Sequence, residues 1–448
     1  MNQLQGSRTE EEKRGRRHRS RLSLRVFLLD CAGQADIIDF KGGIRKGFYS
    51  GECLIMTGSQ ELKLKLKKAL GRVIAEGHPW VFKDALDGPG FGPGRIAAVF
   101  DKLGNFVARG ITDSGPIGLR VMTTRDEAID DALFARRIEA AAVLRDRVVP
   151  PETNTYRLLH GEGDRLPGVV CDVYAEYAVL QFDGQGMITF KTNIVNTLKK
   201  VLEQRQVHNL LLQTGRRTER SLSAELGRLP EKPVAVLEHG MRMQADLIHG
   251  QKTGLFLDHR DSRWQVRKLA TGLTVLNLYG YTGGFSVAAG LAGAETVETV
   301  DIAPAAIEQA NQNWRDNGLD PAGHSGHACE VAEFLTNAAA RRARYDLIVA
   351  DPPSFAPRES KVLASLRGYR ALHRGALELI PKGGYYLAAS CSSHIDRQAF
   401  EKTILDAARQ TDTIIQVLDR WGAPADHPRL LAFDEGDYLK VVLARIVD

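Results

Sequence analysis

The stretch TVLNLYGYTGGFSVAAG, residues 274–290, contains the transition that decides the fold. An apolar run typical of a buried strand stops at Gly280, and a second apolar segment with helical character begins at Phe285, after a glycine-rich turn. Glycines in such a turn let a ligand approach the backbone, although they also make tight turns with no ligand nearby. The spacing differs from GxGxxG, which argues against a dinucleotide.

The same alternation continues to the C-terminus. Further apolar runs typical of strands end at Asp301, Asp351 and Cys391. Helical patterns separate the runs, at residues 285–293, 304–318, 331–343 and 367–380. Alternation of this kind predicts an α/β domain with a parallel, doubly wound sheet over residues 250–448. Ligands of such sheets bind outside the carboxyl ends of the strands, so we expect the four strand ends to face one crevice.

Upstream of residue 250 the sequence predicts four parts. Residues 1–56 carry a charge block typical of a disordered extension, and we expect the native start near Met56. Residues 57–125 contain short apolar runs between Gly, Pro, Asn and Asp, which predict a small β-barrel. A helical linker is expected over 126–150, and a central α/β domain over 151–249.

Composition and charge narrow the class of protein. The chain has 448 residues, too many for one core, and its net charge of +5 is uneven: +4 over residues 1–55, +5 over 57–125 and −4 beyond. A basic front favours a polyanionic partner, with a solvated basic face as the alternative. The five cysteines form no CxxC pair and show no metal-ligand spacing. Together with the lack of a membrane-spanning apolar run, this predicts a cytoplasmic protein with no metal and no membrane partner.

Carboxylates at the strand ends suggest a nucleoside ligand. Asp301 follows Gly280 by 21 residues, a position suited to bonding the two hydroxyls of a ribose. Glu330 follows a possible third strand and could reach an adenine amino group, or it could be a first-turn helix acid. The turn Asp351-Pro-Pro-Ser-Phe is stiff and holds an acid and an aromatic ring where a flat base could stack.

Cys391, in YYLAASCSSHI (385–395), stands where a buried strand ends and a polar loop begins. A cysteine on a buried strand is usually an inert hydrophobic residue. At the fourth of four converging polar strand ends, Cys391 is the one strong nucleophile, and we therefore favour a functional thiol.

These motifs resemble a known family. The segments KTGLFLDHRDSR (252–263), VLNLYGYTGGFSVAA (275–289), DPPSF (351–355) and ASCSSH (389–394) together resemble the bacterial S-adenosylmethionine-dependent large-subunit rRNA cytosine-5 methyltransferases. The resemblance covers residues 57–448 and implies an N-terminal PUA-like barrel, a central α/β domain and a class I Rossmann-like methyltransferase domain. It implies S-adenosyl-L-methionine as cofactor and 23S rRNA, naked or in a large-subunit precursor, as partner. The oligomeric state stays open, with a homodimer as one option.

The resemblance also implies roles for individual residues. Cys391 would be the nucleophile that adds to carbon 6 of cytosine, and Asp351 would stabilise the ring during that addition. The base that removes the carbon 5 proton stays open, with water and His394 as candidates and a structural role as the alternative for His394. The implied cofactor contacts are Phe256, Asp258, Arg260, Asn277, Tyr279, Gly280, Tyr281, Gly283, Asp301, Glu330 and Asp351, with Arg260 on the methionine carboxylate. The family more often has Asp at the position of Glu330.

The basic barrel fits an RNA substrate whose target base is unpaired or flipped out. The expected RNA contacts are Lys63, Lys65, Lys67, Lys68, Arg72, Pro353 and Phe355. One alternative is an rRNA methyltransferase acting on a guanine or adenine nitrogen, which needs no thiol. A second is a non-catalytic ribosome-assembly factor, and the basic barrel argues against a third, a small-molecule methyltransferase.

Overall fold

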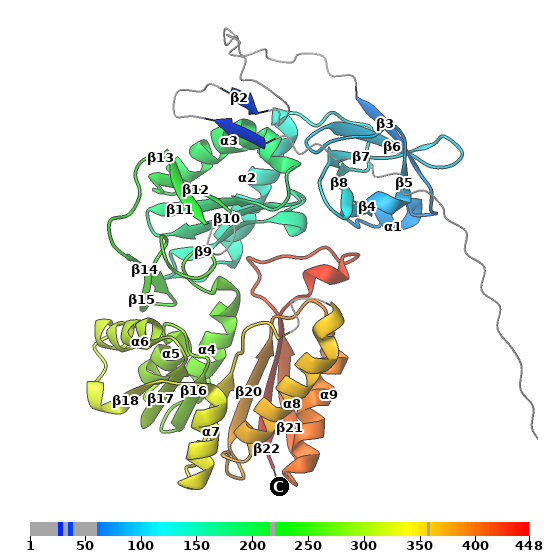
Figure 1. Cartoon of the computed structure of the whole chain (residues 1–448). Helices are drawn as coiled ribbons and strands as arrows, with labels where there is room; N and C mark the ends of the chain where they lie inside the picture. Colours follow the sequence, from blue (N-terminus) through cyan, green and yellow to red (C-terminus); the bar gives the residue numbers. More distant parts are fainter. Residues whose placement is uncertain (1–25, 30–34, 39–60, 216–219, 356–358, 448) are drawn as a thin grey trace, which may run out of the picture. The chain divides into compact units, whose positions relative to one another are not determined.

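The computed structural model describes residues 26–29, 35–38, 61–215, 220–355 and 359–447 (Figure 1). The chain forms two units, Met1–Gln60 and Glu61–Asp448. In the first unit, β1 (Val26–Leu29) pairs with β2 (Ala35–Ile38) in antiparallel register. The predicted disorder of the rest of residues 1–56 lies outside the described residues. None of the described helices is long and apolar enough to cross a membrane.

The second unit begins with a six-stranded sheet in the order β4-β8-β7-β6-β3-β5. Alternation in β3 (Leu62–Leu66) turns Leu62, Leu64 and Leu66 into the core and leaves Lys63 and Lys65 exposed. The remaining elements are α1 (Gly71–Ala75), β4 (Trp80–Phe82), η1 (Lys83–Ala85), β5 (Leu86–Asp87), β6 (Ile96–Phe100), β7 (Phe106–Thr112) and β8 (Ile117–Thr123).

A five-stranded sheet of order β13-β12-β11-β10-β9 forms the centre of the unit. Helix α2 (Asp131–Val148), expected as a linker, packs Phe134 and Ile138 into the core of this sheet together with α3 (Lys191–Glu203). The other elements are β9 (Thr155–His160), η2 (Gly161–Asp164), β10 (Val169–Tyr174), β11 (Tyr177–Phe182), η3 (Met187–Phe190), β12 (Asn209–Thr214) and β13 (Ser221–Leu226). A hairpin of β14 (Val234–Glu238) and β15 (Met241–Ala245) follows.

The C-terminal part is a seven-stranded sheet of order β18-β17-β16-β19-β20-β22-β21. Five strands are parallel, and β22 runs antiparallel to both of its neighbours. The strands are β16 (Thr274–Leu278), β17 (Thr296–Asp301), β18 (His324–Ala328), β19 (Leu347–Ala350), β20 (Tyr385–Ser390), β21 (Ile415–Trp421) and β22 (Lys440–Ile446). The chain order reverses beside β16, which creates the crevice where doubly wound sheets bind ligands.

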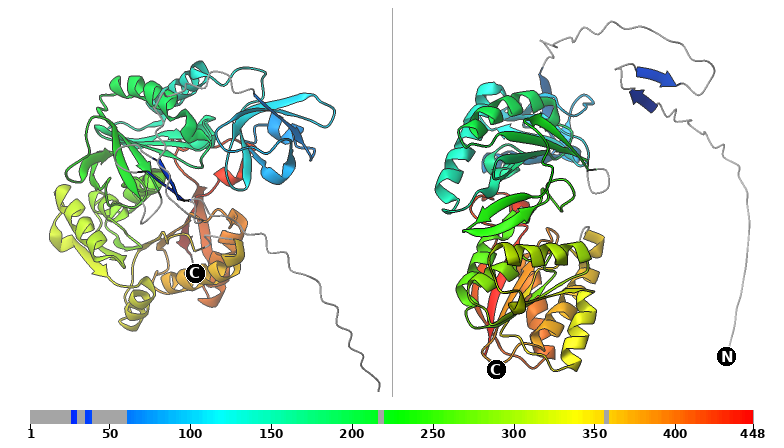
Figure 2. Two further views of the ribbon diagram at one scale, coloured as in Figure 1. Left: turned by 45° about the horizontal axis from the view of Figure 1, so that its top comes forward. Right: turned by 90° about the vertical axis from the view of Figure 1, so that its left-hand side faces the viewer.

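Helices cover both faces of this sheet (Figure 2). Residues of β16 alternate between the two faces: Leu276 packs with α7, α8 and α9, and Val275 packs with α4, α5 and α6. The helices are α4 (Arg260–Leu269), α5 (Gly284–Leu291), α6 (Pro304–Asp316), α7 (Val331–Ala340), α8 (Val362–Leu377) and α9 (Arg397–Gln410), with short helices η5 (Leu257–His259), η6 (Pro321–Gly323), η7 (Glu359–Lys361) and η8 (Asp434–Gly436). The predicted doubly wound sheet is confirmed.

Candidate active site

A cavity of about 400 Å³ opens at the carboxyl ends of the parallel strands. Gly280, Asp301, Asp351 and Cys391, which follow or end four different strands, all line it. Its volume lies in the range of sites that hold a small molecule or cofactor. The predicted convergence of the four strand ends is therefore confirmed. Other expected residues that line the cavity are Phe256, Asp258, Tyr279, Tyr281, Glu330, Pro353 and Phe355.

The end of the cavity beside β17 presents a carboxylate with spare acceptor capacity. Asp301 accepts one backbone hydrogen bond at each oxygen, from Tyr281 N at 2.9 Å and from Ala303 N at 3.0 Å. These bonds fix the carboxylate and leave a lone pair on each oxygen, the arrangement that vicinal hydroxyls require. A Cβ at Gly280 would lie 2.4 Å from the Thr299 side chain, so only glycine fits the turn beside Asp301.

Asp258 is buried in the cavity wall beside two partners. Its Oδ2 accepts from Lys252 Nζ at 2.8 Å and from the Tyr438 hydroxyl at 3.0 Å, whereas its Oδ1 has no hydrogen-bond partner among the described residues. Burial alone would raise the pKa of this carboxyl, but the charge of Lys252 holds the pKa well below its usual range. An ionised acceptor with an open lone pair is therefore available to a cationic group in the cavity.

Cys391 is half-buried and held in a hydroxyl-rich loop. Burial raises the pKa of its thiol to about 11, and the nearby Asp351 carboxylate acts in the same direction. The loop is anchored by Lys440, whose Nζ donates to Ser392 O at 2.6 Å; burial lowers the pKa of this amine to about 8. The thiol is thus protonated at neutral pH in the free protein, and its use as a nucleophile requires proton removal when substrate binds.

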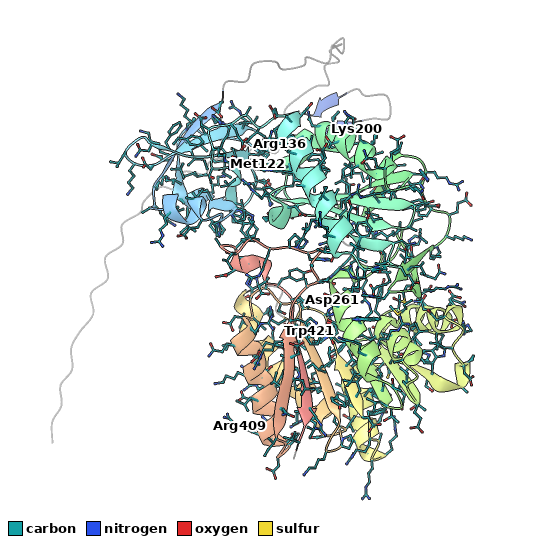
Figure 3. The ribbon with its side chains drawn as sticks, turned by 180° about the vertical axis from the view of Figure 1, so that it is seen from behind. Met122, Arg136, Lys200, Asp261, Arg409 and Trp421 are labelled. Carbon is teal, nitrogen blue, oxygen red and sulfur yellow. The ribbon has the colours of Figure 1, made fainter. Side chains whose placement is uncertain are left out.

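Three side chains in succession, His259, Ser262 and Trp421, support Asp351. Its Oδ2 lies 3.2 Å from His259 Nε2, and His259 Nδ1 lies 3.3 Å from Ser262 Oγ. Trp421 Nε1 donates to the same Ser262 oxygen at 2.9 Å, and Figure 3 shows Trp421 close to Asp261 at this end of the sheet. These contacts join η5, α4 and β21 to the loop after β19.

Three residues expected to contact the cofactor do not line the cavity. Arg260 is buried, and its guanidinium donates two bonds of 2.8 Å to the two oxygens of Asp426, which corrects the expectation of a free carboxylate-binding cation. Asn277 is buried and donates to Ser286 Oγ at 2.8 Å. Gly283 has φ +77°, and a Cβ there would lie 2.7 Å from Ala310, so its role is to let α5 pack closely on α6.

The site also contains residues that the sequence patterns did not predict. The cations that line the cavity are Lys252 and Arg263, and Arg263 is tied to Glu238 by two bonds of 2.6 Å. His259 and Asp426 also went unrecognised, because their partners come from distant segments and no local pattern marks them. His394 is exposed and does not line the cavity, which does not favour it as the base.

The expected RNA contacts of the N-terminal sheet all lie on its surface or rim. Lys63 and Lys65 are exposed and have no ion pair among the described residues. By contrast, Lys68 pairs with Asp84 at 2.6 Å, and Lys67 lies 4.0 Å from Asp87. Arg72 pairs with Glu76, four residues further along the chain. The unpaired cations thus lie on the outward face of β3.

The fold and the cavity define a Rossmann-like methyltransferase, and the comparison with protein families agrees. Residues 191–445 match the S-adenosylmethionine-dependent methyltransferase family, and residues 64–124 match the PUA-like domain family. The cofactor is thus S-adenosylmethionine, and the predicted combination of a PUA-like domain with a Rossmann-like core is confirmed.

Relatives identify the family more narrowly. The chain is 32% identical over 394 residues to a protein of Shewanella denitrificans named ribosomal RNA large subunit methyltransferase I, covering 86% of this chain and 99% of the relative. It is 33% identical over 401 residues to a protein of the same name from Klebsiella pneumoniae, covering 88% and 100%. The chain belongs to this methyltransferase family.

A solved structure has the same fold. A protein from Streptococcus mutans described as an S-adenosylmethionine-dependent methyltransferase aligns with a TM-score of 0.76 at 22% identity, over 86% of this chain and all of that one.

Proposed function

We propose that the protein methylates carbon 5 of a cytosine in large-subunit rRNA through a covalent bond between Cys391 and the base. The observation that carries the proposal is that Cys391 and Asp351 line one cavity with Asp301. The names of the relatives support rRNA of the large subunit as the substrate, and the exposed lysines of β3 suit a polyanion.

The residues of the cavity suit the cofactor. Asp301 offers one free lone pair on each oxygen to the ribose hydroxyls, and the unpartnered Asp258 Oδ1 suits the ammonium of the methionine end. Glu330, at the start of α7, lies on the same cavity for the adenine amino group. Arg260 does not line the cavity, whereas Lys252 and Arg263 do, so these two described cations, paired with Asp258 and Glu238, are the candidates for the methionine carboxylate. Bound S-adenosylmethionine supplies an electrophilic methyl group.

Cytosine carbon 5 is a weak nucleophile, which explains the need for a thiol. Addition of the Cys391 thiolate to carbon 6 pushes electron density to carbon 5 and charge to the ring N3 and carbonyl. Asp351 bonds the polar edge of the ring, and a proton held between its carboxyl and N3 neutralises that charge, while Pro353 and Phe355 bound the base. After carbon 5 is alkylated, a base removes its proton and the thiolate is expelled, which restores the aromatic ring.

His259 acts in this proposal as a positioning residue. With its proton on Nε2, which lies 3.2 Å from Asp351 Oδ2, His259 would donate to that oxygen and accept at Nδ1 from Ser262. This contact would hold one Asp351 oxygen and leave Oδ1 available to the substrate base. Such supporting bonds hold catalytic groups within the narrow geometry that the reaction tolerates.

The test is methyl transfer from labelled S-adenosylmethionine to protein-free large-subunit rRNA, with the product nucleoside identified. Wild type and Cys329→Ala, a matched control in which a half-buried thiol outside the cavity is removed, should both form 5-methylcytosine. Cys391→Ala should form none. A methylated guanine or adenine, or undiminished activity of Cys391→Ala, would replace the proposal with a nitrogen methyltransferase. RNA binding by wild type without methyl transfer would indicate an assembly factor.

A further inference from the structure

A second, larger hollow lies beside the active-site cavity. This groove crosses the ends of β10, β11 and β12 in the central sheet and is closed on one side by the loop of residues 248–253. Its volume is about 1650 Å³. Sites for single small molecules usually have about 300–1,000 Å³, so the groove is sized for an extended ligand.

The groove and the active-site cavity lie next to each other and share two lining residues. Gln251 and Lys252 line both spaces. These two residues are held in place, because Gln251 N donates to the Tyr281 hydroxyl at 3.0 Å and Lys252 Nζ donates to Asp258 at 2.8 Å. Lys252 Nζ also lies 4.4 Å from the centre of the Phe256 ring. A polymer with one unit in the cavity would therefore cross residues 251–252 and enter the groove.

The charges along the groove favour an anionic polymer. Its lining includes the cations Arg157, Arg220 and Lys252 and a single carboxylate, Asp183. Arg157 pairs with Asp172, Lys252 with Asp258, and Asp183 with Arg120, so Arg220 carries the net charge of the lining. The guanidinium of Arg220 bonds two backbone carbonyls, of Leu247 at 2.6 Å and of Gly250, and forms no ion pair within the described residues. A cation that is held by carbonyls keeps its full charge for a phosphate.

The uncharged part of the lining suits nucleobases. Gln181, Gln185 and Gln213 carry amides that both donate and accept, and Gln213 Oε1 has no partner in the described part of the chain. Phe182 and the exposed Ile188 and Ile248 add apolar surface against which bases can pack. Cations, amides and apolar faces along one channel are typical of single-stranded nucleic-acid sites.

We propose that this groove binds the single-stranded RNA segment next to the target base and guides it over Gln251 and Lys252 into the active site. The inference rests on the proposed function, since it assumes an RNA substrate. It adds a substrate-binding role for the central sheet.

The test places negative charge in the groove and measures RNA binding apart from catalysis. The variant Gln185→Glu/Thr214→Glu alters two exposed lining residues, and Gln204→Glu/Gln410→Glu makes the same charge change at exposed residues outside the groove. The probe is a fluorescein-labelled, mixed-sequence single-stranded 8-mer RNA, followed by anisotropy. Repulsion of phosphates should weaken binding roughly 10-fold or more in the groove variant and leave the control unchanged.

Companion measurements separate the possible outcomes. Thermal melting and S-adenosylmethionine affinity should match wild type in both variants, and the KM for rRNA should rise in the groove variant while kcat at saturation is kept. Equal 8-mer affinity in the wild type and in the groove variant would overturn the groove inference and leave a protein partner as the occupant. Groove-dependent 8-mer binding by a protein that forms no 5-methylcytosine would retain the groove and reject the proposed function.

Discussion

His259 Nε2 lies 3.2 Å from Asp351 Oδ2, and this contact joins the segment before α4 to the loop after β19. Both side chains are largely removed from solvent and line the same cavity as Cys391. The contact matters because it links the orientation of Asp351 to that of His259. The His259 ring is in turn held by Ser262, which accepts a hydrogen bond from Trp421.

Replacing His259 should impair catalysis more than binding. His259→Leu removes the donor to Asp351 and should lower kcat about 10- to 100-fold, as losses of supporting bonds at active sites do. His259→Gln keeps an N–H donor and should retain most of the activity. The measurement is steady-state methyl transfer with S-adenosylmethionine affinity by calorimetry. Equal kcat losses in both variants, or a parallel loss of cofactor affinity, would indicate a merely structural role.

The reactivity of Cys391 should increase with pH far above neutrality. Because the folded-state pKa of the thiol is about 11, its thiolate fraction rises about 10-fold per pH unit below that value. Iodoacetamide labelling of Cys391, followed by peptide mass spectrometry, should show this slope from pH 7 to 10. Asp351→Asn removes a neighbouring negative charge and should speed labelling while reducing methyl transfer. A plateau near pH 8 would contradict the assigned environment.

Asp426 should be a major determinant of stability. It is fully buried and bonds Arg260 twice, His427 Nδ1 at 3.0 Å and the backbone N of Arg157 at 3.0 Å. Asp426→Asn removes the two short bonds to Arg260 and leaves its buried charge with Asp261 alone, 3.8 Å from Nε, which should lower the free energy of unfolding by about 3–5 kcal/mol. Urea unfolding followed by circular dichroism measures this change, and Asp412→Asn, at an exposed position, serves as control. A loss below about 1 kcal/mol would refute the expectation.

The same carboxylate should make the fold sensitive to acid. Burial alone would raise the pKa of Asp426, but the hydrogen bond from His427 and the charge of Arg260 hold the pKa well below its usual range. A carboxyl with a lowered folded-state pKa stabilises the protein above its unfolded pKa, and this contribution is lost as the pH falls below that value. The melting temperature of wild type should therefore fall below about pH 4, with a smaller change in Asp426→Asn. Parallel pH profiles would rule out this contribution.

The lysines within β3 and those directly after it should differ in their contribution to RNA affinity. Lys63 and Lys65 have no ion pair among the described residues, whereas Lys67 and Lys68 have Asp87 and Asp84 nearby. Lys63→Gln/Lys65→Gln should weaken rRNA binding and reduce the salt slope by up to about 2, since each phosphate contact contributes about one unit. Lys67→Gln/Lys68→Gln should have a smaller effect. Filter binding between 50 and 200 mM salt checks this, and identical slopes for both variants would refute it.

The sequence predicted the sheet and the four strand ends that meet at its crevice because both follow from local patterns. Continuous apolar runs that end in Gly280, Asp301, Asp351 and Cys391 specify parallel strands with polar carboxyl ends, and parallel strands bring those ends together. The antiparallel pair β21 and β22 was not predicted. The charged sequence of α2 suggested a linker helix. In the structure, however, apolar residues of α2 are buried in the core of the central sheet.

By itself the sequence determined the order of the elements, the doubly wound architecture and which strand-end residues meet at the cavity. The tertiary structure alone decided how those residues are paired. In the sequence Arg260 is predicted to be a free cation, but in the structure it pairs with the buried Asp426. The proposed role of His259 depends on its contact with Asp351, which the sequence does not reveal. Patterns along the chain encode burial and periodicity, whereas a hydrogen bond between distant segments depends on side-chain directions that are fixed only when the layers pack.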